Sequence, residues 1–563
     1  MLDSPLHEDQ LLRYTVDIED KPIRGFNQTA LVSFFDFSGR RLSQVKYGVI
    51  TFEEIIAKID AGENIVLNNA YIKNFSLTDY RTEKGFDDSV FITLKNFSAK
   101  KTFFDCDLLT DFMYAKFEGD KTIFDASIFA NGNADFSNAD FVGGDVSFKK
   151  VKFGNGNVNF QSVHFGEGNI NFNNTNFGSG NLSFVDCSFS HGNVDFKNIY
   201  IGDGNVDFKF ARFENGDISF DKASFGKGKK DFKNIEFGGG KIDFRRVEFN
   251  DGDVVFEGAE FGDGKVNFRS STFGEGHKTF DEADFAHGEA QFDLVEFGTG
   301  SVSFNKTKVH DISFKGCALN CYFDLRLGEC HHVDMSNTIV RDIIDILPED
   351  DHVVIKTLNI SGMRILGRIF IDWRINNVYD LIHSQTETPL FKMAEQFRIL
   401  KENFRNNGQY EDEDAAYLEF KRCESKARLE KDKTTTNIVK KIYAYSNYYF
   451  QRYVFDFIGH YGTNPIRVVA NMGIVFSIFS LFFYFATEYF PSFGTIATTL
   501  PPEYNHIHNF WNTFYYSAIT FFTIGYGDYF AEGYLKPFAA FEGFTGVFLM
   551  SYFTVAFVRK ILR

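Results

Sequence analysis

The sequence predicts a multidomain chain, in which a cytoplasmic β-helical solenoid precedes an α-helical hairpin and an all-α region with two membrane spans. Three observations predict this: a strict twelve-residue repeat, a helical period after residue 393, and two long apolar segments near the C-terminus. We expect the following regions: 1–64, an N-terminal segment and cap; 65–345, the β-helix; 346–392, an exit segment; 393–460, a helical hairpin and interfacial linker; and 461–563, the two-span region.

The composition excludes some classes of partner and compartment. A formal net charge of −17 makes a nucleic-acid partner a poor expectation. The six cysteines are scattered, which fits a reducing compartment better than a disulfide framework. The first ten residues have no basic and apolar signal-peptide pattern, so we expect the region ahead of the spans to stay in the cytoplasm.

The repeat sets the size of the solenoid coil. Every twelfth residue from Phe124 to Phe304 is Phe; a second column from Phe129 to Phe297 is Phe except for Ile201. A third column, from residue 132 to residue 300, is entirely Gly, as expected of repeated corners. Because a twelve-residue ring is too small to enclose stacked Phe rings, we expect two repeats per coil, about 24 residues, with four sides alternating five and seven residues. The strict repeat then gives seven or eight coils, roughly 36 Å at about 4.8 Å each.

The flanks of the repeat relax to a five-residue spacing, as in Ile65–Phe117. This A-[ND]-x-x-[FL]-like spacing resembles the pentapeptide-repeat family, which implies a right-handed, four-sided β-helix. Residues 51–61 are amphipathic and predict a helix that caps the first coil. The glycines are interpreted as turns rather than phosphate loops, because no helix follows them. We interpret the cysteines near the end of the repeat as small core residues. The weaker alternative is a metal cluster of Cys317, Cys321 and Cys330-His331-His332.

A helical period replaces the repeat over residues 393–430, with a break at Asn407-Gly408. It predicts two helices that form a hairpin. The basic and aromatic stretch that follows favours an interfacial helix against anionic lipid over a nucleic-acid site. For the hairpin itself, the favoured interpretation is a structural adaptor.

Two apolar segments, at about 467–487 and 537–558, are long enough to span a bilayer. No Lys or Arg lies between Arg467 and Lys536. Basic residues instead precede the first apolar segment and follow the second one. The positive-inside rule therefore predicts a multi-pass protein of the cell (inner) membrane with cytoplasmic N- and C-termini.

A short apolar helix is expected at about 511–522, between the two spans, and it is followed by the string TIGYGD at 523–528. Such a re-entrant segment is tolerated at membrane depth where it lines protein or water. The string resembles the selectivity filter of potassium channels, and 461–563 resembles the bacterial two-transmembrane potassium channels (ion channel 2 family). The sequence departs from many channels at Phe522, where they have Thr.

The resemblance implies which groups contact the ion. Alternating glycines at 525 and 527 permit a backbone whose successive carbonyls point the same way. K⁺ would be coordinated, in place of its hydration shell, by the Thr523 hydroxyl and by the carbonyls of Thr523, Ile524, Gly525 and Tyr526. The Tyr526 side chain would point away from the ion and pack against the short helix at about 511–522, which the resemblance makes the pore helix. Gly527 completes the filter.

Residues around the filter are expected to support it. Asp528 is expected to accept a hydrogen bond from Tyr515, Tyr516 or Trp511. Glu542 is expected to brace the pore helix. By resemblance, Gly546 would be the point at which the second span bends. Close packing of that helix against a neighbour is an equally favoured role for this glycine.

Each chain has one filter string and the ring needs four, so the expected state is a homotetramer. The leading hypothesis is a passive, potassium-selective channel that is not an enzyme, needs no cofactor beyond the permeant K⁺, and has the lipid bilayer and its own copies as partners. Two alternatives stay open: a weakly selective cation channel, and a membrane-anchored acidic β-helical binding scaffold.

Overall fold

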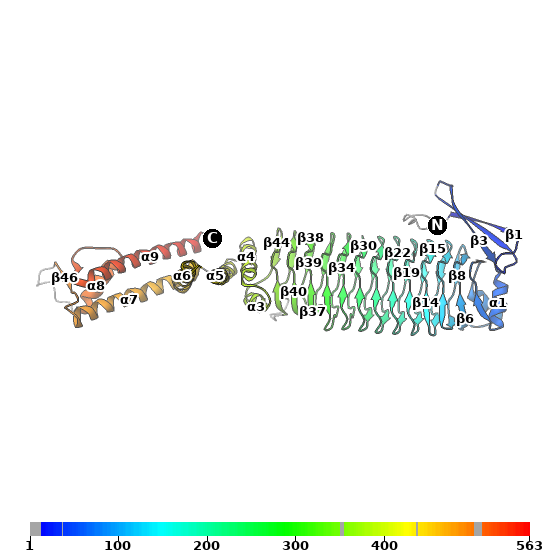
Figure 1. Ribbon diagram of the computed structural model, residues 1–563, viewed down its shortest axis with the longest axis horizontal. Helices are drawn as coiled ribbons and strands as arrows, with labels where there is room; N and C mark the ends of the chain where they lie inside the picture. Colours follow the sequence, from blue (N-terminus) through cyan, green and yellow to red (C-terminus); the bar gives the residue numbers. More distant parts are fainter. Residues whose placement is uncertain (1–12, 37, 349–353, 435–436, 500–508, 563) are drawn as a thin grey trace. The chain divides into compact units, whose positions relative to one another are not determined.

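A computed structural model describes residues 13–36, 38–348, 354–434, 437–499 and 509–562 (Figure 1). The start of the predicted segment 1–64 therefore lies outside the described residues. The chain divides into two compact units, Met1–Thr386 and Glu387–Arg563. Each unit has its own architecture.

The first unit is a β-solenoid with four short strands per coil. One coil contains β11 (Ile128–Phe129), β12 (Asn133–Asp135), β13 (Asp140–Phe141) and β14 (Asp145–Ser147). Each strand pairs in parallel with the strand 24 residues further on, as when Phe129 lies opposite Phe153. The buried positions follow one another at five and seven residues, so the predicted coil size is confirmed.

The Phe columns form the core of the solenoid. Phe124 stacks on Phe148 of the next coil at a centroid distance of 4.6 Å and an angle of 5°. Within one coil, Phe124 and Phe136 meet edge to face at 86°. Such pairs contribute about 0.5–1.5 kcal/mol each beyond the burial of their area. The repeated use of one core position explains why Phe is so abundant while Trp is rare.

The glycine corners allow consecutive coils to approach closely. A Cβ placed on Gly204 would lie 2.0 Å from the carbonyl oxygen of Gly180 in the preceding coil. Next to these corners, Asn side chains form a ladder: the Asn181 side-chain oxygen accepts a hydrogen bond of 2.9 Å from the Asn205 backbone amide. The ladder therefore supplies hydrogen-bond acceptors to backbone amides at the corners of the coils.

The stacking of coils continues beyond the strict repeat. One sheet contains twelve parallel strands, from β8 (Leu109–Asp111) to β45 (Arg368–Phe370). Twelve strands at about 4.8 Å each extend about 53 Å from first to last. The β-helix thus runs past the predicted end at 345, because Ile344 of β42 (Ile343–Asp345) still pairs with Ile369.

The N-terminal end of the solenoid is capped. The predicted helix is α1 (Phe52–Asp60), which begins with a capping box. In this box, the Glu54 amide donates to the Thr51 hydroxyl and the Thr51 amide donates to the Glu54 carboxylate. A second helix, α2 (Leu77–Lys84), was not predicted.

Antiparallel strands precede this cap and were also not predicted. They are β1 (Arg13–Glu19), β2 (Thr29–Phe35) and β3 (Arg41–Val49). β3 pairs in parallel with β5 (Ala70–Lys73), so this hairpin meander joins the solenoid sheet directly.

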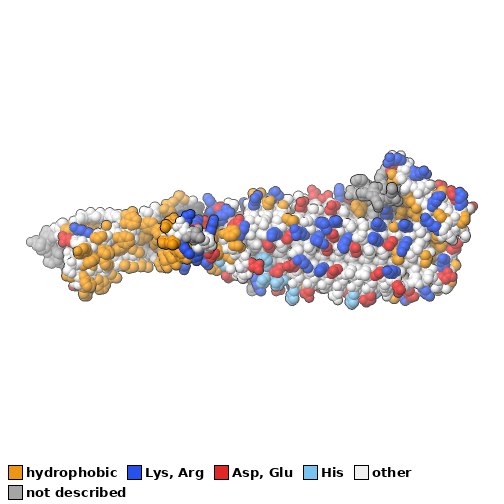
Figure 2. All heavy atoms as spheres, viewed as in Figure 1, with side chains coloured by type: hydrophobic (Ala, Val, Ile, Leu, Met, Phe, Trp, Pro, Cys, Tyr) orange, Lys and Arg blue, Asp and Glu red, His pale blue; other side chains and the backbone are white. Residues whose placement is uncertain are grey.

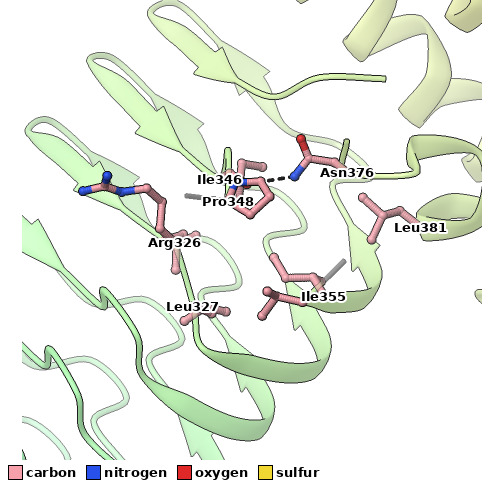
Figure 3. A pocket seen from close by; sticks show the side chains of 9 residues that line it. Arg326, Leu327, Ile346, Pro348, Ile355, Asn376 and Leu381 are labelled. Carbon is pink, nitrogen blue, oxygen red and sulfur yellow. Dashed lines mark hydrogen bonds between the residues drawn. The ribbon is translucent and has the colours of Figure 1, made fainter. Parts of the chain in front are cut away.

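The last coils are closed by α3 (Val378–His383) after β43 (Ile355–Asn359) and β44 (Arg364–Ile365). Figure 3 shows the Asn376 side chain pointing back to the last coils, where it donates a 2.8 Å hydrogen bond to the Ile346 carbonyl. The cavity beside it measures about 20 Å³. That volume fits about one water molecule, so the cavity that the described residues line here is too small for a larger ligand.

The second unit begins with the predicted hairpin. Its helices are α4 (Leu390–Asn406) and α5 (Tyr410–Lys433), and Gly408 between them has a φ of +75°. That left-handed conformation is the usual end of a helix and explains the break. α6 (Ile438–Phe450) follows and continues into a π-helical segment, Gln451–Phe457.

Three further helices complete this unit: α7 (Pro465–Tyr489), α8 (Asn509–Phe521) and α9 (Lys536–Ile561). β46 (Ile496–Thr498) and β47 (Tyr529–Ala531) form a small antiparallel pair between them. α7 and α9, the latter extended from Gly533, are long and apolar enough to cross a membrane. Their surface is largely apolar, in contrast to the charged surface of the solenoid (Figure 2).

Candidate functional site

The short helix α8 packs against α7 and α9. Aromatic rings form much of the contact with α7: Tyr516 meets Phe483 at 5.3 Å and 84°, and Phe514 meets Phe476 at 5.0 Å and 75°. With 13 residues, α8 has a length of about 20 Å, too short to cross the hydrocarbon core. The structure therefore places a short helix between two long ones, close to the predicted range 511–522.

Glu542 lies behind α8. Its Oε1 atom accepts a hydrogen bond from the Ser517 hydroxyl, and both residues are 0% exposed. Among the described residues, its Oε2 atom has no hydrogen-bond partner. The side chain thus links α9 to α8, which is the position that a bracing role requires. Ser517 was not predicted, although a hydroxyl in a short apolar helix near an intramembrane acid was a usable signal.

Gly546 lies against the end of α8. A Cβ at this position would lie 1.9 Å from the Phe521 carbonyl oxygen. α9 is a single helix from Lys536 to Ile561 through this contact. The geometry supports the close-packing role of Gly546 that the sequence left open beside the hinge.

The chain after α8 has an alternating backbone. Thr523, Gly525 and Gly527 have φ angles of +55°, +61° and +79°. The Ile524 and Gly525 amides donate hydrogen bonds of 2.8 and 3.2 Å to the Ile519 carbonyl, which ties the segment to the C-terminus of α8. Alternate residues in the left-handed region can turn successive carbonyls to one side of the segment.

In the single chain this segment is open to its surroundings. Tyr526 is 72% exposed, so the predicted packing of its side chain on α8 is not made within one chain. Apart from the glycine itself and its two chain neighbours, no described residue has an atom within 4 Å of a Cβ built on Gly525 or Gly527. The Thr523 hydroxyl, predicted to contact the ion, donates a 2.8 Å hydrogen bond to the Phe522 carbonyl.

Asp528 ends the segment and is held from two sides. Of the three predicted donors, Tyr515 is the one whose side chain interacts with the Asp528 carboxylate, although the buried Asp528 Oδ1 atom has no hydrogen-bond partner among the described residues. Trp511 is 57% exposed and contacts the rings of Phe510 and Phe514, while Tyr516 is buried against α7. The Asp528 carbonyl also accepts hydrogen bonds from Thr498 and Thr499 ahead of α8.

A polar cluster links α5 to the C-terminal end of α9. Asp414 forms ion pairs of 3.2 Å with both Arg559 and Lys560. The Arg559 guanidinium lies 4.2 Å above the centre of the Tyr417 ring. Sequence reasoning missed this contact, because the residues are about 145 positions apart and no pattern pairs them.

A second ion pair holds α5 to the segment ahead of α7. The Arg422 guanidinium donates two hydrogen bonds, of 2.9 and 2.8 Å, to the Asp456 carboxylate, and a third to Glu419. Hydrogen bonding to Asp456 raises the pKa of Arg422. This bidentate geometry is the strong form of an arginine–carboxylate contact.

Comparison with known proteins supports a channel. Residues 472–563 match the family model described as "Ion channel", a range that begins within α7 and includes α8, the alternating segment and α9. Neither the curated proteins nor the solved structures contain a significant match to the chain. The C-terminal region is therefore an ion-channel domain of a membrane protein. The N-terminal unit is a β-solenoid consistent with pentapeptide repeats.

Proposed function

We propose that this protein is one subunit of a potassium-selective channel that conducts K⁺ passively through a homotetrameric pore. The observation that carries the proposal is the alternating positive φ at Thr523, Gly525 and Gly527, directly after α8. A filter needs successive carbonyl oxygens on one side, and this alternation supports that arrangement. Carbonyls of Thr523, Ile524, Gly525 and Tyr526 would then replace the hydration shell of K⁺.

The orientation of α8 favours a cation. The C-terminal end of a helix carries about half a negative elementary charge from its aligned peptide dipoles. In this chain, that end is next to the alternating segment, since the Ile519 carbonyl accepts from the amides of Ile524 and Gly525. A cation at the segment would lie in a favourable field.

The open face of the segment supports a homotetramer. Each chain contributes one string, and one string cannot surround an ion. The exposed Tyr526 ring and the open surroundings of both glycines leave the surface that neighbouring copies would cover. The Tyr526 side chain would then pack against a neighbouring copy.

The charge distribution supports an inner-membrane protein with cytoplasmic termini. No Lys or Arg lies between Arg467 and Lys536, whereas Arg559 and Lys560 end α9. The solenoid would then lie in the cytoplasm, where a regulatory or scaffolding role is open to it.

The proposal is tested by K⁺ flux in proteoliposomes, with Gly525→Ala as the variant and Gly473→Ala as the matched control. Ala at a φ of +61° costs about 1–2 kcal/mol in each chain and redirects the carbonyl, so we expect K⁺ flux to be lost. Gly473 lies in α7 with open space around it, so its replacement leaves flux unchanged.

Mixed Na⁺/K⁺ reversal potentials separate the proposal from its alternatives. Equal permeability of the two ions points to a weakly selective cation channel. Absence of flux from the unsubstituted protein points to a membrane-anchored acidic scaffold. Full K⁺-selective flux in Gly525→Ala would contradict the assignment of the filter.

A further inference from the structure

One corner of the solenoid differs from the regular corners. In a regular coil, inward-facing Phe285 and Ala290 are five residues apart, with a glycine corner between them. In the next coil, inward-facing Val309 and Ile312 are three residues apart, and the corner becomes part of the continuous strand β37 (Lys308–Ser313). The following coil repeats this form in β40 (Glu329–Asp334).

This shortened corner places two histidines side by side on the surface. The pairing of Val309 with Cys330, and of Asp311 with His332, sets His310 opposite His331. Their rings stack at 4.8 Å and 9°. Figure 2 shows histidine side chains gathered at one edge of the solenoid, in the part where β37 and β40 lie.

Asp311 completes a three-residue cluster with these histidines. Its carboxylate oxygens lie 3.3 Å from His310 Nδ1 and 3.6 Å from His331 Nδ1. One ligand atom from each residue lies within 4.8 Å of the others. The Asp311 Oδ1 atom is buried and has no hydrogen-bond partner among the described residues.

We propose that His310, Asp311 and His331 bind one divalent transition-metal ion of the Zn²⁺ class. Ligands about 2.0–2.1 Å from a tetrahedral ion are about 3.3–3.4 Å apart. His310 Nδ1 lies 3.3 Å from Asp311 Oδ2 and His331 Nδ1 lies 3.6 Å from Asp311 Oδ1, so the carboxylate and the stacked rings must turn to bring both nitrogens and one oxygen to a single ion. Two imidazoles and one carboxylate match the ligands of Zn²⁺, Co²⁺ or Ni²⁺, whereas Ca²⁺ and Mg²⁺ need an oxygen-rich shell. The fourth position is left for water.

The surroundings of the cluster modulate its affinity. Glu289 lies opposite Asp311 on the preceding coil, but Lys265 engages its carboxylate at 2.5 Å. On the following coil, the register places Lys356 opposite His331. This cation weakens metal binding electrostatically, so we expect Lys356→Ala to tighten it.

The site is distinct from the cysteine cluster that the sequence raised as an alternative. Cys317, Cys321 and Cys330 are at most 2% exposed and face the core. Burial raises the pKa of the Cys321 thiol to about 11, which disfavours the thiolate that a metal needs. Of the predicted cluster, His331 is the residue that joins the new site.

The proposal is tested by titrating ZnCl₂ into the purified full-length protein and into His331→Ala, with isothermal calorimetry and thermal unfolding as readouts. We expect one Zn²⁺ site per chain, a higher unfolding midpoint with Zn²⁺, and loss of both in His331→Ala and in Asp311→Asn. His191→Ala is the matched control, because His191 also pairs with a carboxylate, that of Glu214, and has no place in this cluster. It should keep the Zn²⁺ site.

Co²⁺ substitution gives a spectroscopic readout. A site with two nitrogen ligands, one oxygen ligand and water predicts intense visible absorption of the four-coordinate type, absent in His331→Ala. Millimolar MgCl₂ should not compete. Circular dichroism without metal verifies that the variants fold, as expected for residues at the surface of the solenoid. Unchanged Zn²⁺ stoichiometry in both His331→Ala and His310→Ala would overturn the proposal.

Discussion

At the scale of single residues, the Ser517–Glu542 contact is the most consequential in the ion-channel domain. The Ser517 hydroxyl is the hydrogen-bond partner of a fully buried carboxyl group that joins α8 to α9. A buried polar group that loses its partner costs about 1–3 kcal/mol. The Ser517 hydroxyl therefore helps to hold α8, and with it the alternating segment, in position beside the aromatic contacts with α7.

Ser517→Ala should lower the thermal unfolding midpoint of the detergent-solubilised protein, because it leaves the Glu542 carboxyl without its donor. The matched control is Ser477→Ala, since Ser477 in α7 is exposed and bonds to the Gly473 carbonyl of its own helix. That control should have little effect. Equal midpoints for the two variants would show that the Ser517 contact does not stabilise the domain.

At the scale of elements, α5 is fastened to α9 through Asp414. The Asp414 side chain is 12% exposed and the Arg559 side chain 24%, so this pair is shielded more than a typical surface ion pair. The Arg559 guanidinium also covers the Tyr417 ring. A movement of the hairpin would therefore act on the last turn of α9.

A double-mutant cycle of Asp414→Ala and Arg559→Ala should give a coupling energy of about 0.5–3 kcal/mol, measured by chemical unfolding in detergent micelles. The reference cycle is Glu424 and Arg428, an exposed pair four residues apart on α5. Such helix pairs contribute about 0.2–0.5 kcal/mol. A coupling at Asp414 no larger than this reference would refute the fastening role.

At the scale of the whole molecule, the two units have separate cores and the solenoid is built from nearest-neighbour contacts. Phe208 stacks on Phe184 at 4.8 Å and on Phe232 at 5.2 Å. Each coil contacts its neighbours alone in such an array, so the effects of a defect should fade with distance along the stack.

Phe208→Ala should cost about 3–5 kcal/mol locally. Hydrogen exchange should rise in the coils around residues 184–232 and stay unchanged in 390–434. Phe210→Ala is the control, because this Phe is two residues away and 47% exposed. Increased exchange throughout the chain would contradict independent units.

The candidate site was partly predictable. The string TIGYGD and its place between two apolar segments located the alternating backbone at Thr523, Gly525 and Gly527. The Tyr515–Asp528 contact was one of three open choices, because local spacing does not say which ring of a helix faces the following loop. Ser517 and Asp414 were missed, since their partners lie on other elements.

The sequence alone determined the coil. Twelve-residue columns of Phe and Gly can close a Phe-filled ring when two repeats form one turn, so period and side-chain volume together specify four sides and 24 residues. Tertiary structure alone decided the N-terminal antiparallel strands, the continuation of the coils to Phe370 and the meeting of His310 with His331. The physical reason is that periodicity reports which face of an element is buried, whereas contacts between non-repeating segments depend on how the elements pack.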